Sequence, residues 1–244
     1  MKKTNSQTTR IAEYITKMLP WAHGHQLKAI MAVVLAIVET QTANQAEIAR
    51  SFGNKEAAVR RVGRLIHNER VGPKIIAEAV LSQALAQLPE RTKVRIAIDW
   101  TVERTRHLLV VSLVMGHRAV PIYWRAYDEK VLKGRMRRYE MAVIKRVLTR
   151  MLAVVERHRI FVTADRGFAD VVLFDLLSQF NVQFIIRVKG STKVEWKGEW
   201  RKLNSFGFQR NERRRNLGHL AYCEGDPHRL YITMSRACLS DKMA

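Results

Sequence analysis

Cysteine and proline are scarce in this 244-residue chain, which contains two Cys, five Pro and 12 Gly. The two cysteines, Cys223 and Cys238, support neither a disulfide framework nor a cysteine-based zinc site. The longest apolar stretch, residues 29–38, is about half as long as a helix that crosses a bilayer. No apolar core follows Lys2 and Lys3, so no signal peptide is predicted. We therefore expect a cytoplasmic protein without a membrane partner.

Acidic residues are also few. The 22 Asp and Glu stand against 43 Lys and Arg, which leaves a formal charge of +21. Such an excess implies a polyanionic partner, nucleic acid first and an acidic membrane second, and favours the bacterial nucleoid as the location. Since phosphate contacts release counterions, affinity for nucleic acid should fall steeply with salt. With 47% apolar residues, the chain should form one main domain and a smaller one.

The first third of the chain has the apolar periodicity of helices, beginning near residue 11. Segments 26–40, 44–52, 55–68 and 74–88 carry apolar residues at helical spacing, and Gly53 and Gly72-Pro73 mark breaks. We expect residues 1–90 to form a small helical domain. Pro89-Glu90-Arg91 is the predicted linker to the remainder.

Segment 45–68 has the order of a helix-turn-helix: a short helix, a glycine turn, Asn54 as a cap candidate and a basic second helix. In that second helix we expect Val59, Val62 and Ile66 to face inward. The basic residues expected to face outward are Lys55, Arg60, Arg61 and Arg64. The pattern fits docking on DNA, and it fits equally a basic amphipathic helix within a bundle.

From residue 94 onward the period becomes that of strands. Three strands are predicted at 94–101, 107–114 and 119–124, followed by a helix at 135–155 and a strand that ends at Asp165. A further helix is predicted at 169–180 and a further strand at 183–188. Because a crossover helix joins parallel neighbours, the strands of Asp99 and Asp165 can lie side by side. The remaining short strand candidates are 194–200, 217–223 and 230–234, with the basic residues Arg210, Arg213, Arg214 and Arg215 between two of them.

Two aspartates, Asp99 and Asp165, each follow an apolar run of strand type. A carboxylate at a sheet loses hydration, which is costly unless a cation, hydrogen bonds or a metal compensates. Two neighbouring carboxylates can hold two magnesium ions for an in-line displacement at phosphorus. The alternative from spacing alone is that both aspartates cap strand ends and pair with Arg95 or Arg166. His23-Gly24-His25 also has metal-like spacing, but a turn is the favoured interpretation.

Four segments resemble the nuclease core of bacterial insertion-sequence transposases of the DDE type, with the insertion-sequence four family as the nearest match. They are Asp-Trp-Thr at 99–101, Ala-Val-Pro-Ile-Tyr-Trp-Arg at 119–125, Thr-Ala-Asp-Arg-Gly-Phe at 163–168 and Phe-Ile-Ile-Arg-Val-Lys-Gly at 184–190. The resemblance covers residues 27–234. It implies an α/β fold with an RNase H-like mixed sheet flanked by helices, its first part within 91–190. It also implies Asp99 and Asp165 as the first two catalytic and metal-binding acids, with two Mg²⁺ or Mn²⁺ ions in a complete site.

The third acid of this family follows a β-rich insertion and lies on a helix with the order Tyr, two residues, Arg, three residues, Glu, six residues, Lys. Glu195 and Lys202 have the last of these spacings, but Ser191 stands where Arg should be, so we reject Glu195. We therefore expect the chain to end within an incomplete insertion, residues 191–244. Strand cleavage by this chain should then be impaired.

The resemblance implies a DNA transposase that binds double-stranded insertion-sequence ends as a homodimer and cleaves and transfers strands there. The residues expected to contact DNA are Lys55, Arg60, Arg61, Arg64, Arg104, Arg125, Arg166, Arg187 and Lys189. Two alternatives stay open. One is a non-catalytic DNA-binding protein that inhibits transposition, and the other is a helix-turn-helix transcriptional regulator.

Overall fold

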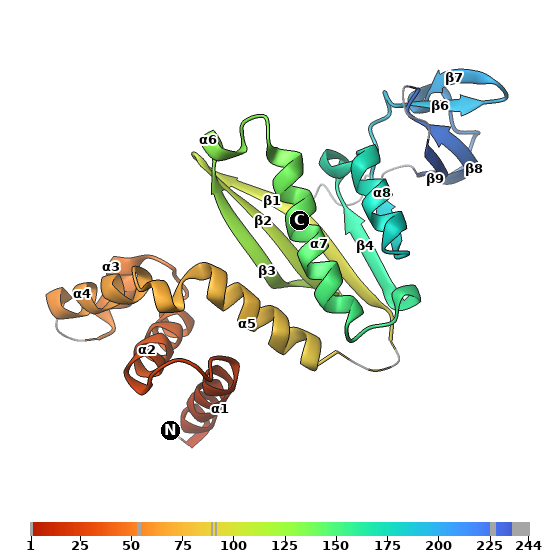
Figure 1. Ribbon diagram of the computed structural model, residues 1–244. Coiled ribbons are helices and arrows are strands. Elements are labelled where there is room, and N and C mark those ends of the chain that lie inside the picture. Colours follow the sequence, from red (N-terminus) through yellow and green to blue (C-terminus); the bar gives the residue numbers. More distant parts are fainter. Residues whose placement is uncertain (1, 53–54, 89, 91, 225–227, 236–244) are drawn as a thin grey trace. The chain divides into compact units, whose positions relative to one another are not determined.

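The computed structural model describes residues 2–52, 55–88, 90, 92–224 and 228–235, with side chains described for all of these except 2–7 and Lys55. This part of the chain is a mixed α/β structure, as expected from the sequence, and has eight α-helices and two sheets (Figure 1). It divides into two compact units, residues 1–92 with 100–155 and residues 93–99 with 156–244. Within the described residues, no helix is long and apolar enough to cross a membrane.

The first unit begins with five helices, α1 (Lys2–Met18), α2 (Gly24–Thr40), α3 (Gln45–Arg50), α4 (Lys55–Ile66) and α5 (Pro73–Ala86). Helix α1 begins at Lys2, whereas the sequence predicted a start near residue 11. The earlier start was not predicted because residues 2–9 contain no apolar side chain that could show helical spacing. The Asn44 side chain caps α3 by accepting a 2.9 Å hydrogen bond from the backbone N–H of Ala46. Pro73 begins α5, where its missing N–H costs no helical hydrogen bond.

Helices α2, α3 and α4 form a three-helix cluster. Ala36 of α2, Ile48 of α3 and Val62 of α4 are its buried centre, with Val33 and Phe52 packed against them. The order of a short helix, a connection and a second helix over 45–66 agrees with the predicted segment. The predicted glycine turn and cap at Gly53 and Asn54 lie outside the described residues.

The inward face of α4 differs from the prediction. Ala58 and Val62 are buried, whereas Val59 and Ile66 are 37% and 56% exposed. The helix is rotated so that the small Ala58 packs closely, which a pattern of large apolar residues does not reveal. Arg60, Arg61 and Arg64 are exposed, as expected.

A five-stranded mixed sheet has the order β3-β2-β1-β4-β5. Its strands are β1 (Val94–Glu103), β2 (Arg106–Met115), β3 (Arg118–Asp128), β4 (Ile160–Ala164) and β5 (Gln183–Ile186). Strands β2 and β3 are antiparallel, whereas β4 runs parallel to both β1 and β5. The sheet's helices are α6 (Glu129–Leu132), α7 (Met136–Leu152) and α8 (Val171–Gln179). The predicted strand and helix order of this region is confirmed, with the short α6 as an additional helix that was not predicted. The linker residues Pro89 and Arg91 lie outside the described residues.

The second sheet has the order β7-β6-β8-β9. It contains β6 (Lys193–Trp196), β7 (Glu199–Lys202), β8 (Arg214–Tyr222) and β9 (His228–Ser235). The single strand predicted over 194–200 is wrong: Lys197 and Gly198 have φ of 55° and 85° and turn the chain into a hairpin. Two residues of positive φ suit the twist of a tight hairpin. Buried Val194, Leu217 and Ile232 pack with Phe174 of α8 beneath this sheet.

Candidate functional site

Of the two candidate metal ligands, Asp165 directly follows strand β4, whereas Asp99 lies within the neighbouring parallel strand β1, which continues to Glu103 instead of ending near the aspartate. Ile98 of β1 is opposite Ala164 of β4, and Ala164 is opposite Ile186 of β5. The residues that follow these three in the chain are Asp99, Asp165 and Arg187. A carboxylate, a second carboxylate and a guanidinium group therefore follow one register row across three strands.

Strand alternation sets the direction of the two carboxylates. Ile98 and Ala164 are buried, so Asp99 and Asp165 are expected on the opposite side of the sheet, and both are exposed. Asp165 keeps an extended backbone, with φ −78° and ψ 171°, before the short helix that follows. Neighbouring strands are about 4.8 Å apart, which is within the reach of one cation shared by two carboxylates. The Thr163 hydroxyl donates a 2.9 Å hydrogen bond to the Ile96 carbonyl and ties the two strands together.

Arg187 extends toward the second carboxylate. Its backbone N–H donates to the Ala164 carbonyl at 3.1 Å, and a guanidinium nitrogen lies 3.6 Å from a carboxylate oxygen of Asp165. The two side chains are 81% and 53% exposed, so solvent screens this pair and it contributes at most about 1 kcal/mol. Asp165 can therefore exchange Arg187 for another cation at little cost. Arg166 and Lys189 are exposed nearby in the chain.

Asp99 and Asp165 fit a hard divalent cation, because both are accessible carboxylates on a rigid sheet. Their roles as catalytic residues and metal ligands stay predictions. Among the described residues, no group of three or more His, Cys, Asp or Glu side chains comes together in a metal-binding arrangement. Glu195 lies in strand β6, opposite Trp200, and not on a helix.

Glu140 of α7, a buried carboxylate that belongs to no sequence motif, anchors the residue after Asp99. The Trp100 indole N–H donates to Glu140 at 2.7 Å, and Arg137 donates to its other oxygen at 2.7 Å. Glu140 is 1% exposed, so these two donors supply hydrogen bonds that water cannot. No local pattern could have found this contact, because its partners are 40 positions apart.

Glu140→Ala is expected to lower the free energy of unfolding by about 2–3 kcal/mol, because it removes the buried carboxylate that accepts hydrogen bonds from the half-buried Trp100 indole and from Arg137. Urea unfolding followed by circular dichroism measures the effect. Glu129→Ala, at an exposed position in α6, is the matched control and should change stability by less than about 0.5 kcal/mol. Equal stability of the wild type and Glu140→Ala would contradict an anchoring role.

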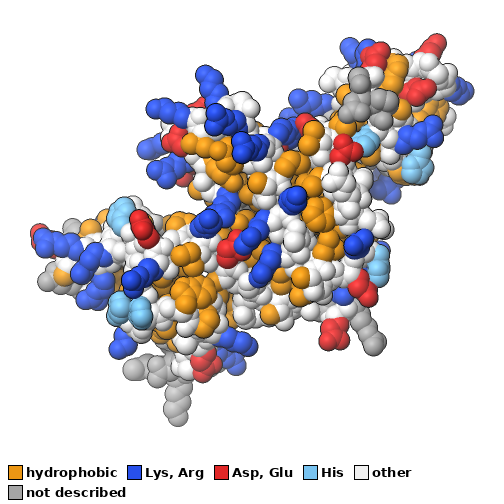
Figure 2. Space-filling view, in the orientation of Figure 1, with side chains coloured by type: hydrophobic (Ala, Val, Ile, Leu, Met, Phe, Trp, Pro, Cys, Tyr) orange, Lys and Arg blue, Asp and Glu red, His pale blue; other side chains and the backbone are white. Residues whose placement is uncertain are grey.

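The basic face of α4 forms one candidate nucleic-acid surface. Figure 2 shows Lys and Arg side chains gathered over the α3 and α4 part of the visible face. Arg60 forms a 3.6 Å ion pair with Glu56, and both side chains are more than 75% exposed. Arg61 and Arg64 line a cavity of about 430 Å³ between α2 and α4, together with Lys28. The Lys55 side chain lies outside the described residues.

The other predicted DNA contacts in the first unit differ in surroundings. Arg104 is exposed in the turn between β1 and β2, with φ 53°. Arg125 of β3 is half-buried: its Nε donates to the Tyr123 hydroxyl at 3.1 Å, and its guanidinium lies 5.5 Å from the Tyr123 ring centre. Part of its hydrogen-bonding capacity is therefore used within the protein. DNA contact by either residue stays a prediction.

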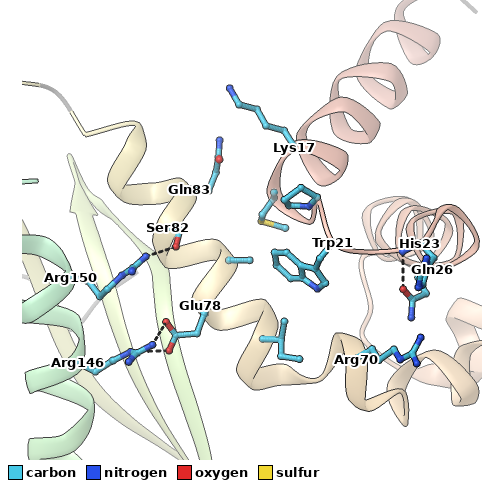
Figure 3. Close-up of a pocket in the computed structure, with 14 residues that line it drawn as sticks. Lys17, Trp21, His23, Gln26, Arg70, Glu78, Ser82, Gln83, Arg146 and Arg150 are labelled. Atoms are coloured by element: carbon cyan, nitrogen blue, oxygen red, sulfur yellow. Dashed lines mark hydrogen bonds and ion pairs between the residues drawn. The ribbon is translucent and has the colours of Figure 1, made fainter. Parts of the chain in front are cut away.

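A larger cavity of about 820 Å³ lies in the first unit, and we call it the α1–α5 groove (Figure 3). Its walls come from the end of α1, the following turn, α5 and α7. Four cations and one carboxylate are among its lining side chains, which include Lys17, Trp21, Arg70, Glu78, Arg146 and Arg150. His23 also lines the groove at the start of α2, and its ring stacks on that of His25 with 5.8 Å between centres.

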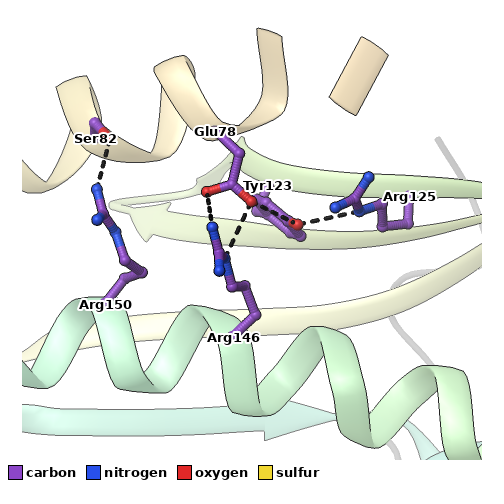
Figure 4. Close-up of polar contacts among 6 residues, drawn as sticks. All are labelled: Glu78, Ser82, Tyr123, Arg125, Arg146 and Arg150. Atoms are coloured by element: carbon purple, nitrogen blue, oxygen red, sulfur yellow. Dashed lines mark hydrogen bonds and ion pairs between the residues drawn. The ribbon is translucent and has the colours of Figure 1, made fainter. Parts of the chain in front are cut away.

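Two polar contacts join α5 to α7 along this groove (Figure 4). Glu78 accepts hydrogen bonds from Arg146 Nε at 3.1 Å and from the Tyr123 hydroxyl at 3.1 Å. One turn further along both helices, Arg150 donates to the Ser82 hydroxyl at 2.8 Å. Burial acts to raise the pKa of Glu78, but the hydrogen bonds from Arg146 and Tyr123 outweigh it and leave the pKa below its ordinary value.

The lowered pKa of Glu78 predicts a pH-dependent contribution to stability. The carboxylate is stabilised in the folded state, so its contribution is complete above the unfolded pKa, near 4.5, and is lost as the pH falls through the lower folded pKa. At neutral pH, Glu78→Gln should lower the free energy of unfolding by about 1 kcal/mol. Urea unfolding at a series of pH values should show this difference shrinking below pH 4.5. A difference that grows on acidification would contradict the assignment.

In comparisons with known proteins, no protein-family model matches this sequence, and no curated protein matches it.

Proposed function

We propose that this chain is a DNA-binding protein of the DDE transposase type, with Asp99 and Asp165 as ligands of Mg²⁺ or Mn²⁺. The observation that carries the proposal is that Asp99, within β1, and Asp165, directly after β4, follow Ile98 and Ala164, which lie opposite each other in these neighbouring parallel strands. The sheet order, with an antiparallel β2–β3 pair on one side of β1 and parallel β4 and β5 on the other, supports the RNase H-like assignment. The formal charge of +21 supports a nucleic-acid partner.

The chain's own residues have distinct tasks in this proposal. Asp99 and Asp165 supply carboxylate oxygens and hold them at a fixed spacing, because β1 and β4 are tied together by ladder and side-chain hydrogen bonds. Arg187 leaves its exposed pair with Asp165 and meets a DNA phosphate. When bound, the divalent ion supplies Lewis-acid stabilisation of an in-line displacement at phosphorus. Arg166 and Lys189 add positive charge for the DNA backbone, and two chains hold the two element ends as a homodimer.

A second candidate function is DNA binding without cleavage, as in an inhibitor of transposition. The ion pair between Arg187 and Asp165 favours it, because a guanidinium group can take the place of a metal ion beside that carboxylate. Only two carboxylates of the described residues meet in this row. In this version, the exposed arginines of α4 bind element ends and the aspartate row takes no part in chemistry.

One experiment separates the two functions. The purified chain is incubated with a plasmid that carries its own coding region and flanking DNA, in Mg²⁺ and separately in Mn²⁺. Nicks at the borders of the element support the metal-dependent nuclease. If border fragments migrate more slowly in a gel with the protein bound and stay uncut in both metals, the chain is the non-catalytic binder. Absence of any preference for the borders over vector DNA would contradict both.

A further inference from the structure

The α1–α5 groove carries more positive charge than its internal contacts neutralise. Glu78 is its only carboxylate and is satisfied by Arg146 and Tyr123. Lys17 and Arg70 are exposed and have no carboxylate partner among the described residues. Arg150 donates one hydrogen bond to Ser82 and has further guanidinium N–H groups that can donate to a ligand. An anion entering this groove therefore meets three available cations.

An aromatic side chain stands among these cations. Trp21 is 46% exposed, and Figure 3 shows its ring extending into the groove between the Lys17 end and the Arg70 end. Met18 and Ile75 supply further apolar lining. A flat aromatic surface beside several cations suits a ligand that has both a planar ring and a phosphate, because the ring stacks while the phosphate is neutralised.

We propose that the α1–α5 groove binds a nucleotide unit, with its base stacked on Trp21 and its phosphate held by Arg70, Arg150 and Lys17. The cavity volume of about 820 Å³ is in the range of sites for ligands of this size. An acidic peptide would match the charge but would leave the indole face without a planar partner. None of the three cations that hold the phosphate belongs to the aspartate row or to α4, so the groove does not rest on the proposed function.

The nucleotide unit can come from a free nucleotide or from an unpaired strand. Gln26 lines both this groove and the neighbouring cavity that contains Lys28, Arg61 and Arg64. Basic side chains therefore line both cavities, which meet at Gln26. A strand can use this whole track, whereas a free nucleotide uses only the groove.

Fluorescence anisotropy of a labelled single-stranded oligodeoxynucleotide, with the full chain, tests the site. Trp21→Ala should weaken binding about tenfold or more, because stacking of one base is lost. Tyr14→Ala is the matched control, since Tyr14 is an aromatic residue of similar exposure, 44%, that lies in α1 and does not line the groove. Unchanged affinity of Trp21→Ala, or an equal loss in Tyr14→Ala, would overturn the proposal.

Trp21 follows the buried Leu19 and precedes Ala22 of the helical core, so a second pair of variants protects the test against a folding defect. Arg150→Gln should weaken binding several-fold and lower the salt slope by about one, while Arg138→Gln, at an exposed position of α7 outside the groove, should do neither. Equal slopes for the two variants would refute the phosphate contact.

Competition assigns the source of the nucleotide. Displacement of the oligonucleotide by deoxyadenosine monophosphate supports a free nucleotide, and displacement only by unlabelled single strand supports a nucleic-acid strand. Inorganic phosphate that competes as well as the nucleotide would refute base stacking. A variant with Arg60, Arg61 and Arg64 replaced by Ala should still respond to Trp21→Ala, even if duplex binding through α4 has failed.

Discussion

Asp165→Asn is expected to abolish metal-dependent nicking of element-border DNA, with a loss of at least about 10³-fold in rate. The substitution keeps the shape of the side chain but removes the charge that attracts the divalent cation. Since Asp99 and Asp165 share one register row, they should act on the same ion, and losing either should disable the whole site. Asp99→Asn should therefore cause a similar loss, and the double variant should be little worse than either single variant.

A readout other than activity separates the metal site from a folding effect. Titration of the protein with Mn²⁺ by isothermal calorimetry should show binding to the wild type and much weaker binding to Asp165→Asn. The side chain is 53% exposed and its pair with Arg187 is weak, so the free energy of unfolding should change by less than about 0.5 kcal/mol.

Glu195→Gln is the matched control for the aspartate variants. Glu195 is exposed in β6, and its spacing from Lys202 imitates part of the family signature. It should bind Mn²⁺ and nick DNA as the wild type does. Full activity of Asp165→Asn, or loss of activity in Glu195→Gln, would contradict the assignment of the two acids.

Much of the central sheet could be predicted because its strands carry local signals. The apolar runs before Asp99 and Asp165 and the helix between them specify a parallel pair, and the structure has that pair with Ile98 opposite Ala164. Register follows from the same pattern, since a one-residue slip would expose Ile96 and Ile98. The pairing of the two strands that carry or precede these aspartates was thus predictable from the sequence.

Two predictions were wrong, for the strand over 194–200 and for the inward face of α4, because each depends on interactions that a local sequence pattern does not reveal. The β6–β7 hairpin turns at Lys197 and Gly198, within a stretch whose aromatic and apolar residues resemble one continuous strand. The rotation of α4 depends on how closely Ala58 approaches its neighbours, which is a property of packing. The contacts of Glu140 with Trp100 and of Glu78 with Arg146 join residues 40 and 68 positions apart. Such pairs become visible only when the chain is folded.

Replacing Arg60, Arg61 and Arg64 together by Ala should weaken binding to element-border duplex DNA about 10²-fold or more at moderate salt. These side chains are exposed on α4, opposite the buried Ala58 and Val62, so their loss removes charge without opening the core. Each phosphate contact releases about one counterion, and the slope of log affinity against log salt should therefore become shallower by about 2.7 if all three contact phosphate. Electrophoretic mobility shift assays over a salt series measure both quantities.

The control variant replaces Lys130, Arg138 and Lys145 by Ala, which removes the same charge from exposed positions of α6 and α7. If only net charge attracts DNA, the two triple variants will lose affinity equally and show equal salt slopes, and α4 will have no special role. If α4 docks on DNA, only its own variant should also lose the preference for border DNA over random duplex, because positioning of the helix in the groove is required to read sequence. A loss of affinity with the border preference intact would identify the three arginines as backbone contacts and place sequence reading in other residues.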